Sequence, residues 1–248
     1  MLRLDDIFTP LALAGALTFV CAVPPGALAA PNAAPAAAKA APTALFPALA
    51  RYADSLPAGF DALPADRKKQ LDKLALYIKS RRSAGEPARL VYICTHNSRR
   101  SHMGQLFASL AAAYYGIEGV ETFSGGTEVT AFNPRAVAAL SRAGFVITPS
   151  GSDNPRYRVA FSAGRPAVVA FSKVYDDPAN PKRDFAAIMT CSHADKTCPM
   201  VAGASLRAPL HYEDPKVSDG TPEEAAVYDG RARQIATEAF YLFSRLRS

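Results

Sequence analysis

Apolar residues recur along the middle of the chain at two spacings, one typical of helices and one typical of buried strands. Between residues 64 and 82 they recur at i, i+3, i+4 and i+7 among lysines and arginines, which predicts an amphipathic helix. The apolar positions of this helix are Leu71, Leu74, Ala75 and Ile78. The run Leu90–Ile93 then predicts a strand that becomes polar at Cys94.

The same two spacings continue to the end of the chain in alternation. We expect helices over residues 103–116, 134–144 and 221–246, and strands over residues 120–124, 157–161, 167–171, 185–190 and 206–212. Asn133–Pro134 has the form of an N-cap with a first-turn proline, and Thr221–Glu224 has the form of a capping box. Residues 162–166 would close a hairpin.

This alternation predicts an α/β fold, with a small, mostly parallel sheet and helices on both faces. An inserted hairpin and an N-terminal helix would be added to it. In such sheets ligands bind at the carboxyl ends of the strands. The polar segments after Ile93, after residue 190 and after residue 212 would therefore meet at one edge.

The first fifty residues differ in composition from the rest. An apolar run over Leu11–Val23, followed by Ala27–Leu28–Ala29, predicts a signal peptide over 1–29, although its first residues are unusually acidic. Residues 30–50 are rich in alanine and proline and predict a linker, which leaves 51–248 as the folded domain. We therefore expect a periplasmic or secreted protein with no stable membrane insertion after cleavage.

The net charge is +6, but the basic residues are scattered and the chain has no tryptophan. This favours a surface suited to small anions over a nucleic-acid interface, so nucleic acid is not an expected partner.

The segment after the first strand has the chemistry of an anion site. A loop from Cys94 to Arg100 that turns its N–H groups inward would hold a tetrahedral oxyanion at a helix N-terminus, beside a guanidinium. The cysteine sulfur would lie next to the anion as a thiolate nucleophile. The expected substrate-binding residues are Thr95, His96, Asn97, Ser98, Arg99, Arg100 and Ser101.

From about Arg89 onward, the chain resembles the low-molecular-weight protein tyrosine phosphatases and the thioredoxin-coupled arsenate reductases that share their fold. The motifs are Cys-x5-Arg-Ser after a strand, with asparagine at its fourth position, and the downstream pair Asp214–Pro215. The resemblance implies that Cys94 is the nucleophile, Arg100 the oxyanion clamp and Asp214 the general acid. It also implies that Asn97 shapes the loop and that Ser101 bonds the thiolate.

Cys191 and Cys198 distinguish the two branches, since the segment from Cys191 to Pro199 is similar to the redox segment of the arsenate reductases. That resemblance implies a relay in which Cys191 attacks the adduct on Cys94 and Cys198 resolves the disulfide. Other interpretations are a static disulfide, which export would favour, a zinc site with His193 and His211, or idle thiols.

Several positions depart from the family pattern. His96 stands where glycine is usual, Arg99 adds charge, and Gln105 replaces an acidic cation ligand, so we expect no bound monovalent ion. Residues 150–183 are longer than the usual connection. An exported enzyme would also need a reductant other than cytosolic thioredoxin.

The sequence therefore predicts a cysteine-nucleophile enzyme, arsenate reductase-like, with no metal or bound cofactor. An external thiol reductant, such as a thioredoxin-like protein, would be its partner. One alternative is a phosphatase acting on phosphotyrosine or small phosphoesters, with Cys191 and Cys198 as a staple. Another is a non-catalytic oxyanion-binding or redox-sensing protein in which His96 has abolished turnover.

Overall fold

The computed structural model describes residues 44–198 and 200–247. The expected signal peptide and most of the expected linker lie outside these residues. None of the helices in the described part is long and apolar enough to cross a membrane.

A four-stranded parallel sheet forms the centre of the domain, in the order β2-β1-β6-β7. Its strands are β1 (Ala88–Cys94), β2 (Val120–Gly126), β6 (Phe185–Met189) and β7 (Ala204–Pro209). The α/β class is therefore confirmed. Cys94 is the last residue of β1 and pairs with Gly126, the last of β2, so the loop after Cys94 leaves the sheet at its carboxyl edge.

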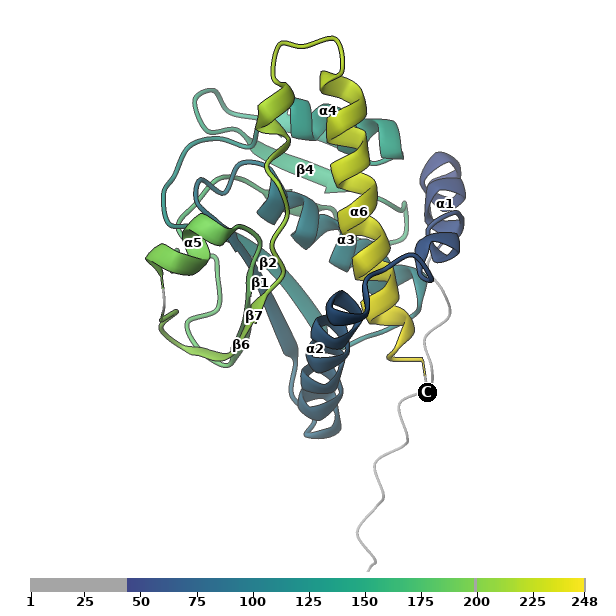
Figure 1. Ribbon diagram of the computed structural model, residues 1–248, viewed down its shortest axis with the longest axis vertical. Helices are drawn as coiled ribbons and strands as arrows, with labels where there is room; N and C mark the ends of the chain where they lie inside the picture. The colour runs from purple at the N-terminus through teal and green to yellow at the C-terminus, as the bar shows by residue number, and fades with distance from the viewer. Residues whose placement is uncertain (1–43, 199, 248) are drawn as a thin grey trace, which may run out of the picture. The chain divides into compact units, whose positions relative to one another are not determined.

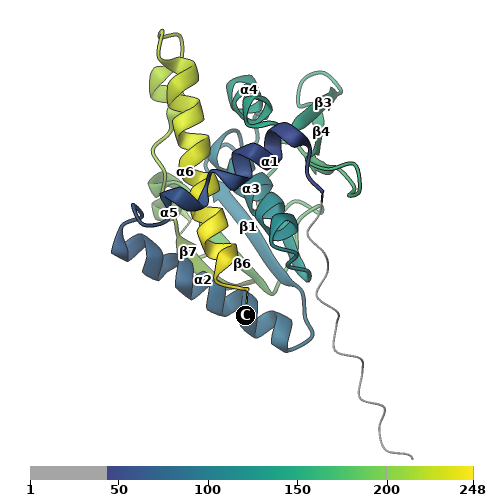
Figure 2. The same ribbon diagram turned by 90° about the vertical axis from the view of Figure 1, so that its right-hand side faces the viewer.

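Long helices cover one face of the sheet. They are α2 (Ala65–Ser83), α3 (Arg100–Tyr114) and α6 (Glu224–Ser244), with α4 (Pro134–Ala143) packed against α6. Figures 1 and 2 show α6 lying along α3, and α2 running beside the sheet. Leu90 and Tyr92 point into this larger core, where Phe107 and Phe240 are fully buried.

The opposite face is covered more thinly. Val91 and Ile93 lie in a smaller apolar cluster there, because successive side chains of β1 alternate between the faces. The short helix α5 (Ser192–Thr197) contributes Ala194 to this cluster. The two clusters bury β1 on both faces, so the strand that carries Cys94 is enclosed in the sheet, as is its neighbour β6.

A second, antiparallel sheet contains the expected hairpin and one strand more. It consists of β3 (Val146–Ser150), β4 (Arg156–Ala160) and β5 (Val168–Ala170). The hairpin of β4 and β5 is confirmed. β3 was not predicted, because four of its five residues are exposed and Pro149 interrupts its pattern.

The folded region begins before residue 51, so the expected linker boundary is wrong. Helix α1 (Pro47–Asp54) is followed by a single 3-10 turn, η1 (Pro57–Gly59). Leu49 is completely buried, and Phe46 donates its N–H to the carbonyl of Phe161 at 3.0 Å. Composition alone concealed this helix, because the few apolar residues that anchor it follow a long alanine- and proline-rich stretch.

One of the two expected helix caps is present. Asn133 accepts a hydrogen bond from the N–H of Arg135, and α4 ends at Gly144 with a left-handed φ of 110°. The expected capping box is wrong, since α6 begins at Glu224 and the hydroxyl of Thr221 donates to Ser218 instead. Ser218 is the last residue of the turn η2 (Pro215–Ser218), which leads from Asp214 toward α6.

Gly126 has no room for a side chain, and this gives a test of how tightly β2 fits the loop. A Cβ there would lie 2.6 Å from the Thr95 carbonyl oxygen and 2.7 Å from the Asn97 nitrogen. We expect Gly126→Ala to lower the free energy of unfolding by about 1–3 kcal/mol, measured by urea denaturation, and to impair anion binding. Gly230→Ala is the control. Gly230 lies in α6 with open space around it, so this substitution should raise the free energy of unfolding by up to about 1 kcal/mol. Equal stability of the two variants would contradict this packing.

Candidate active site

The loop from Cys94 to Arg99 has its carbonyl groups held outward by the surrounding segments. The donors are Thr127 N for Cys94 O (3.2 Å), Glu128 N for Thr95 O (2.8 Å), Thr130 Oγ1 and Ser172 Oγ for His96 O (3.0 Å each), and Asn133 N for Ser98 O (2.9 Å). Within the described residues, the N–H groups of residues 96–100 make no hydrogen bond. The loop therefore presents free amide donors on its inner side, at the start of α3, as an anion site requires.

Asn97 determines the shape of this loop. It is fully buried and has a φ of 43°, a left-handed conformation that asparagine tolerates better than most residues. Its Nδ2 donates to Ser101 Oγ at 2.8 Å, and its Oδ1 accepts from Lys173 N at 3.0 Å. Because Asn97 donates to the Ser101 oxygen, the Ser101 hydroxyl hydrogen is available to Cys94 Sγ, 3.1 Å away.

Arg100 and Asp214 lie in direct contact. The guanidinium donates to Asp214 Oδ2 at 2.8 Å and to the carbonyl of Tyr212 at 2.9 Å. The other oxygen of Asp214 accepts from the N–H of Lys216. The structure thus brings the expected clamp, Arg100, and the expected acid, Asp214, into contact. The carboxylate binds the guanidinium N–H groups that an oxyanion would use.

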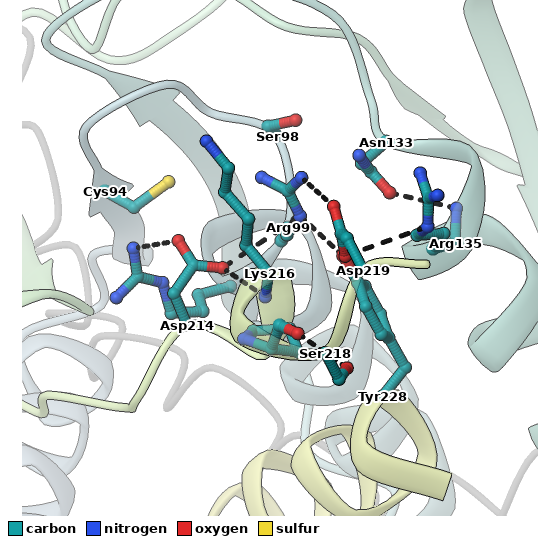
Figure 3. Close-up of polar contacts among 12 residues, drawn as sticks. Cys94, Ser98, Arg99, Asn133, Arg135, Asp214, Lys216, Ser218, Asp219 and Tyr228 are labelled. Carbon is teal, nitrogen blue, oxygen red and sulfur yellow. Dashed lines mark hydrogen bonds and ion pairs between the residues drawn. The ribbon is translucent and has the colours of Figure 1, made fainter. Parts of the chain in front are cut away.

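Arg99 extends this contact into a network. Its Nε donates to the hydroxyl of Tyr228 at 2.7 Å, and its Nη2 lies 3.3 Å from Asp219 Oδ2. Asp214 Oδ1 lies 4.0 Å from the same Nε. Figure 3 shows these side chains together, with Asp214 on the side of Cys94 and Asp219 beside Tyr228. Arg99 therefore binds the segment after Asp214 to the loop.

Two other positions of the loop point away from its centre. His96 lies 3.4 Å from Glu128 through Nε2, and nearly half of its side chain is exposed. Ser98 donates its hydroxyl to the carbonyl of Ala131 at 2.7 Å. Both side chains support the outer wall of the loop, and the expected contribution of these two residues to anion binding reduces to their backbone N–H groups.

Thr95 connects the loop to the second cysteine. Its Oγ1 lies 3.5 Å from Cys191 Sγ, and Cys191 belongs to the same buried cluster as Cys94. Cys191 is also the N-cap of α5, where its sulfur accepts the N–H of Ala194 at 3.4 Å. The fold therefore places two thiols at one edge of the sheet, both nearly inaccessible to solvent.

Cys198 lies at the other end of α5 and is partly exposed. Its thiol donates to the carbonyl of Met200 at 3.3 Å. Cys94, Cys191 and Cys198 are all free thiols in this structure. Among the described residues, no group of three or more His, Cys, Asp or Glu side chains could hold a metal ion, and His211 pairs with Asp195 instead.

The insertion supports the loop from behind, which nothing in the sequence indicated. Ser172 bonds the His96 carbonyl, and Lys173 bonds Asn97 through its backbone. Lys173 is 4% exposed, and burial lowers the pKa of its ammonium to about 8 against the opposing effect of Asp177. Its own sequence pattern gave no signal, since a lone lysine between two strands is usually a solvated residue.

Gln105, which replaces the acidic residue of the family pattern, is buried on α3. Its Nε2 donates to the carbonyl of Thr122 at 3.0 Å, so this side chain joins α3 to β2.

No family model matches the chain. It is 28% identical to an arsenate reductase of Shouchella clausii over 144 residues, which cover 58% of this chain and 86% of the relative. It is 27% identical to one of Bacillus licheniformis over 155 residues, 62% of this chain and 94% of the relative. The chain is similar to arsenate reductases. The expected resemblance is thereby confirmed, and it supports a cysteine-based enzyme.

Solved structures of the same kind are more distant. A thioredoxin-dependent arsenate reductase of Corynebacterium glutamicum is 19% identical, with 75% of this chain and 92% of that chain covered and a TM-score of 0.35. A low-molecular-weight protein tyrosine phosphatase of T. tengcongensis is 18% identical, with 63% and 98% covered and a TM-score of 0.42. The fold assignment rests on the sheet order described above.

His102, on the first turn of α3, provides a test by pH. It is fully buried and stacks on Phe132 at 4.0 Å, and its pKa is lowered from 6.5 to about 3 by burial and by Lys173. A lowered pKa means that the folded protein resists protonation, so stability is complete above pH 6.5 and falls as the pH drops toward 3. Because His102 is protonated more readily in the unfolded chain, we expect it to lower the free energy of unfolding by about 2 kcal/mol between pH 7 and pH 5.

The measurement is urea unfolding as a function of pH. His102→Gln should flatten the acid limb of the stability profile, whereas His193→Gln, an exposed histidine on α5, should leave it unchanged. An acid limb that is the same in all three proteins would contradict the assignment.

Proposed function

We propose that this protein is an arsenate reductase that uses Cys94 as nucleophile and passes the resulting oxidation to Cys191 and Cys198. The similarity to curated arsenate reductases supports the class of enzyme. The observation that carries the finer proposal is the contact between Thr95 and Cys191, which brings a second thiol against the oxyanion loop. A phosphatase has no chemical need for that thiol.

Arsenate would enter by exchange with a carboxylate. Arg100 now binds Asp214, so an oxyanion on the loop amides competes with Asp214 for the guanidinium. Once released, a protonated Asp214 is free to donate to the oxygen that leaves arsenic as Cys94 attacks. Ser101 would bond the attacking sulfur, and Arg99 would retain the segment after Asp214 through Asp219.

Reduction then takes two electrons from two thiols. The sulfur of Cys191 attacks the sulfur of Cys94 in the arsenate adduct, the sulfur–arsenic bond breaks, and its electron pair leaves with arsenic as arsenite. A disulfide between Cys94 and Cys191 remains. Attack by Cys198 on Cys191 transfers the disulfide to that pair and frees Cys94, and an external dithiol restores both thiols.

The last transfer requires α5 to unwind. Cys191 and Cys198 flank this helix, so seven residues of helical rise separate them by about 10 Å. A disulfide needs its Cα atoms within about 7 Å. The helical state is therefore the dithiol state, and a static Cys191–Cys198 bridge would require a different structure for residues 192–197.

We also propose that the protein is exported, which the composition of residues 1–29 supports. Its reductant would then be a thioredoxin-like protein outside the cytosol.

Phosphatase activity is the second candidate, and a specific observation favours it. Cys94, Ser101, Asn97, Arg100 and Asp214 form a complete set for attack on phosphorus, and none of their contacts involves Cys191. A purely binding role loses its main argument, because His96 points outward and leaves the inner side of the loop free.

The decisive experiment compares two substrates. We expect the wild-type protein to reduce arsenate with thioredoxin and its reductase, and to hydrolyse p-nitrophenyl phosphate more slowly. Cys191→Ser should abolish the first activity and spare the second, because only the first needs the second thiol. Cys94→Ser should abolish both.

The alternatives give different results. Hydrolysis without arsenate reduction in the wild-type protein would favour the phosphatase. Absence of both activities would overturn the enzyme assignment, and undiminished arsenate reduction by Cys191→Ser would overturn the relay.

Export is tested by the N-terminus of the protein produced in a Gram-negative host. We expect the mature chain to begin at Ala30, in the periplasmic fraction. An intact N-terminus in the cytosolic fraction alone would contradict export.

A further inference from the structure

Arg207 makes contacts that the mechanism above does not use. It lies on β7, and its Nη2 donates to the carbonyl oxygens of Asp195 at 2.6 Å and Cys198 at 3.3 Å. The same nitrogen lies 2.5 Å from Asp195 Oδ1. One guanidinium thus binds both the backbone and a side chain of the redox helix α5, at the end where Cys198 lies.

These contacts give hydrogen-bond donors to backbone carbonyls at the C-terminal end of α5. The last carbonyls of a helix have no partner within it, and the C-terminal end carries partial negative charge. Arg207 supplies donors and positive charge to this end. His211, two residues after β7, reaches Asp195 Oδ2 at 3.0 Å from the same side.

Arg207 is attached to the central sheet through β7. Arg207 pairs with Ala187 of β6, which is completely buried in the sheet, and the Arg207 side chain is only 30% exposed. Arg207 therefore joins α5, which would have to unwind for the disulfide to form, to a strand that is paired into the central sheet.

We propose that Arg207 is a positioning residue that holds Cys198 away from Cys191 and thereby sets the reduction potential of this pair. The inference rests on the proposed relay. The contacts of Arg207 exist while α5 is helical, which is the dithiol state, and the disulfide requires residues 192–197 to leave that conformation. Arg207 thus stabilises the dithiol over the disulfide and makes the pair a stronger oxidant.

The reaction that reports this is a simple exchange. The thiols of Cys191 and Cys198 react with oxidised dithiothreitol, giving the protein disulfide and reduced dithiothreitol, with two electrons and two protons passing to the reagent. A variant without the clamp loses stability in the dithiol form alone, so its equilibrium moves toward the disulfide.

The experiment uses the full chain with Cys21→Ser and Cys94→Ser, which leaves Cys191 and Cys198 as the two remaining thiols. The protein is equilibrated in dithiothreitol buffers of graded ratio, alkylated, and analysed by mass. We expect Arg207→Ala to shift the equilibrium about tenfold toward the disulfide, which corresponds to a potential about 30 mV more negative.

Two further variants make the result specific. Asp195→Asn keeps its backbone carbonyl but loses the ion pairs, and should shift the potential in the same direction by less. Arg142→Ala removes an arginine that binds both oxygens of Asp229 between α4 and α6, far from α5 in sequence, and should cause no shift. Thermal unfolding of each dithiol form establishes that the variants are folded.

The outcomes separate the two proposals. If the parent forms the Cys191–Cys198 disulfide but Arg207→Ala and Asp195→Asn have the parent's potential, the role of Arg207 is overturned while the relay stands. If the parent forms no such disulfide in these buffers, nor with glutathione disulfide, which is a stronger oxidant, the relay itself is overturned.

Discussion

The site depends on the direction of the peptide groups between Cys94 and Arg99. Each carbonyl of this loop that is bonded, from Cys94 through Ser98, is drawn outward by a donor from another segment. The N–H groups of the same peptide units therefore face inward, because the N–H and C=O of a peptide group point in opposite directions. In the proposed anion site the backbone amides would already face the ligand, and only the contact between Arg100 and Asp214 would have to separate. Donors that are oriented in advance in this way are effective at a reacting centre.

The donors come from distant parts of the chain. Residues 127–133 follow β2, and Ser172 and Lys173 belong to the insertion after β5. The insertion therefore supports the loop through hydrogen bonds to His96 and Asn97. Gly126 belongs to the same arrangement, because any side chain there would displace the loop from its supports.

The charged side chains around the loop pair with one another. Arg100 is bound by Asp214, and Arg99 by Asp219 and Tyr228, so neither guanidinium is left buried without a partner. In the proposed mechanism an arriving oxyanion would replace the carboxylate at Arg100 and free Asp214 to act as the acid. The contact of Thr95 with Cys191 at one end of α5, and the contacts of Arg207 at the other, connect the loop to the two further thiols that the proposed relay would use.

The sequence by itself determined the parallel sheet, the strand that ends at Cys94, the helix that follows, the N-cap at Asn133 and the resemblance to arsenate reductases. These features are local or carried by motifs, since periodicity and capping act over a few residues. Only the tertiary structure decided where the folded region begins, that a third strand joins the hairpin, and that Thr221 does not cap α6. It also decided that His96 points outward, and that Lys173 and Arg207 serve the loop and α5. The physical reason is that His96 and Lys173 meet their partners, Glu128 and Asn97, only when segments far apart in the chain fold together, and a chain read in order carries no signal for such pairs. Thr221 instead bonds the carbonyl of Ser218 in the turn that precedes α6.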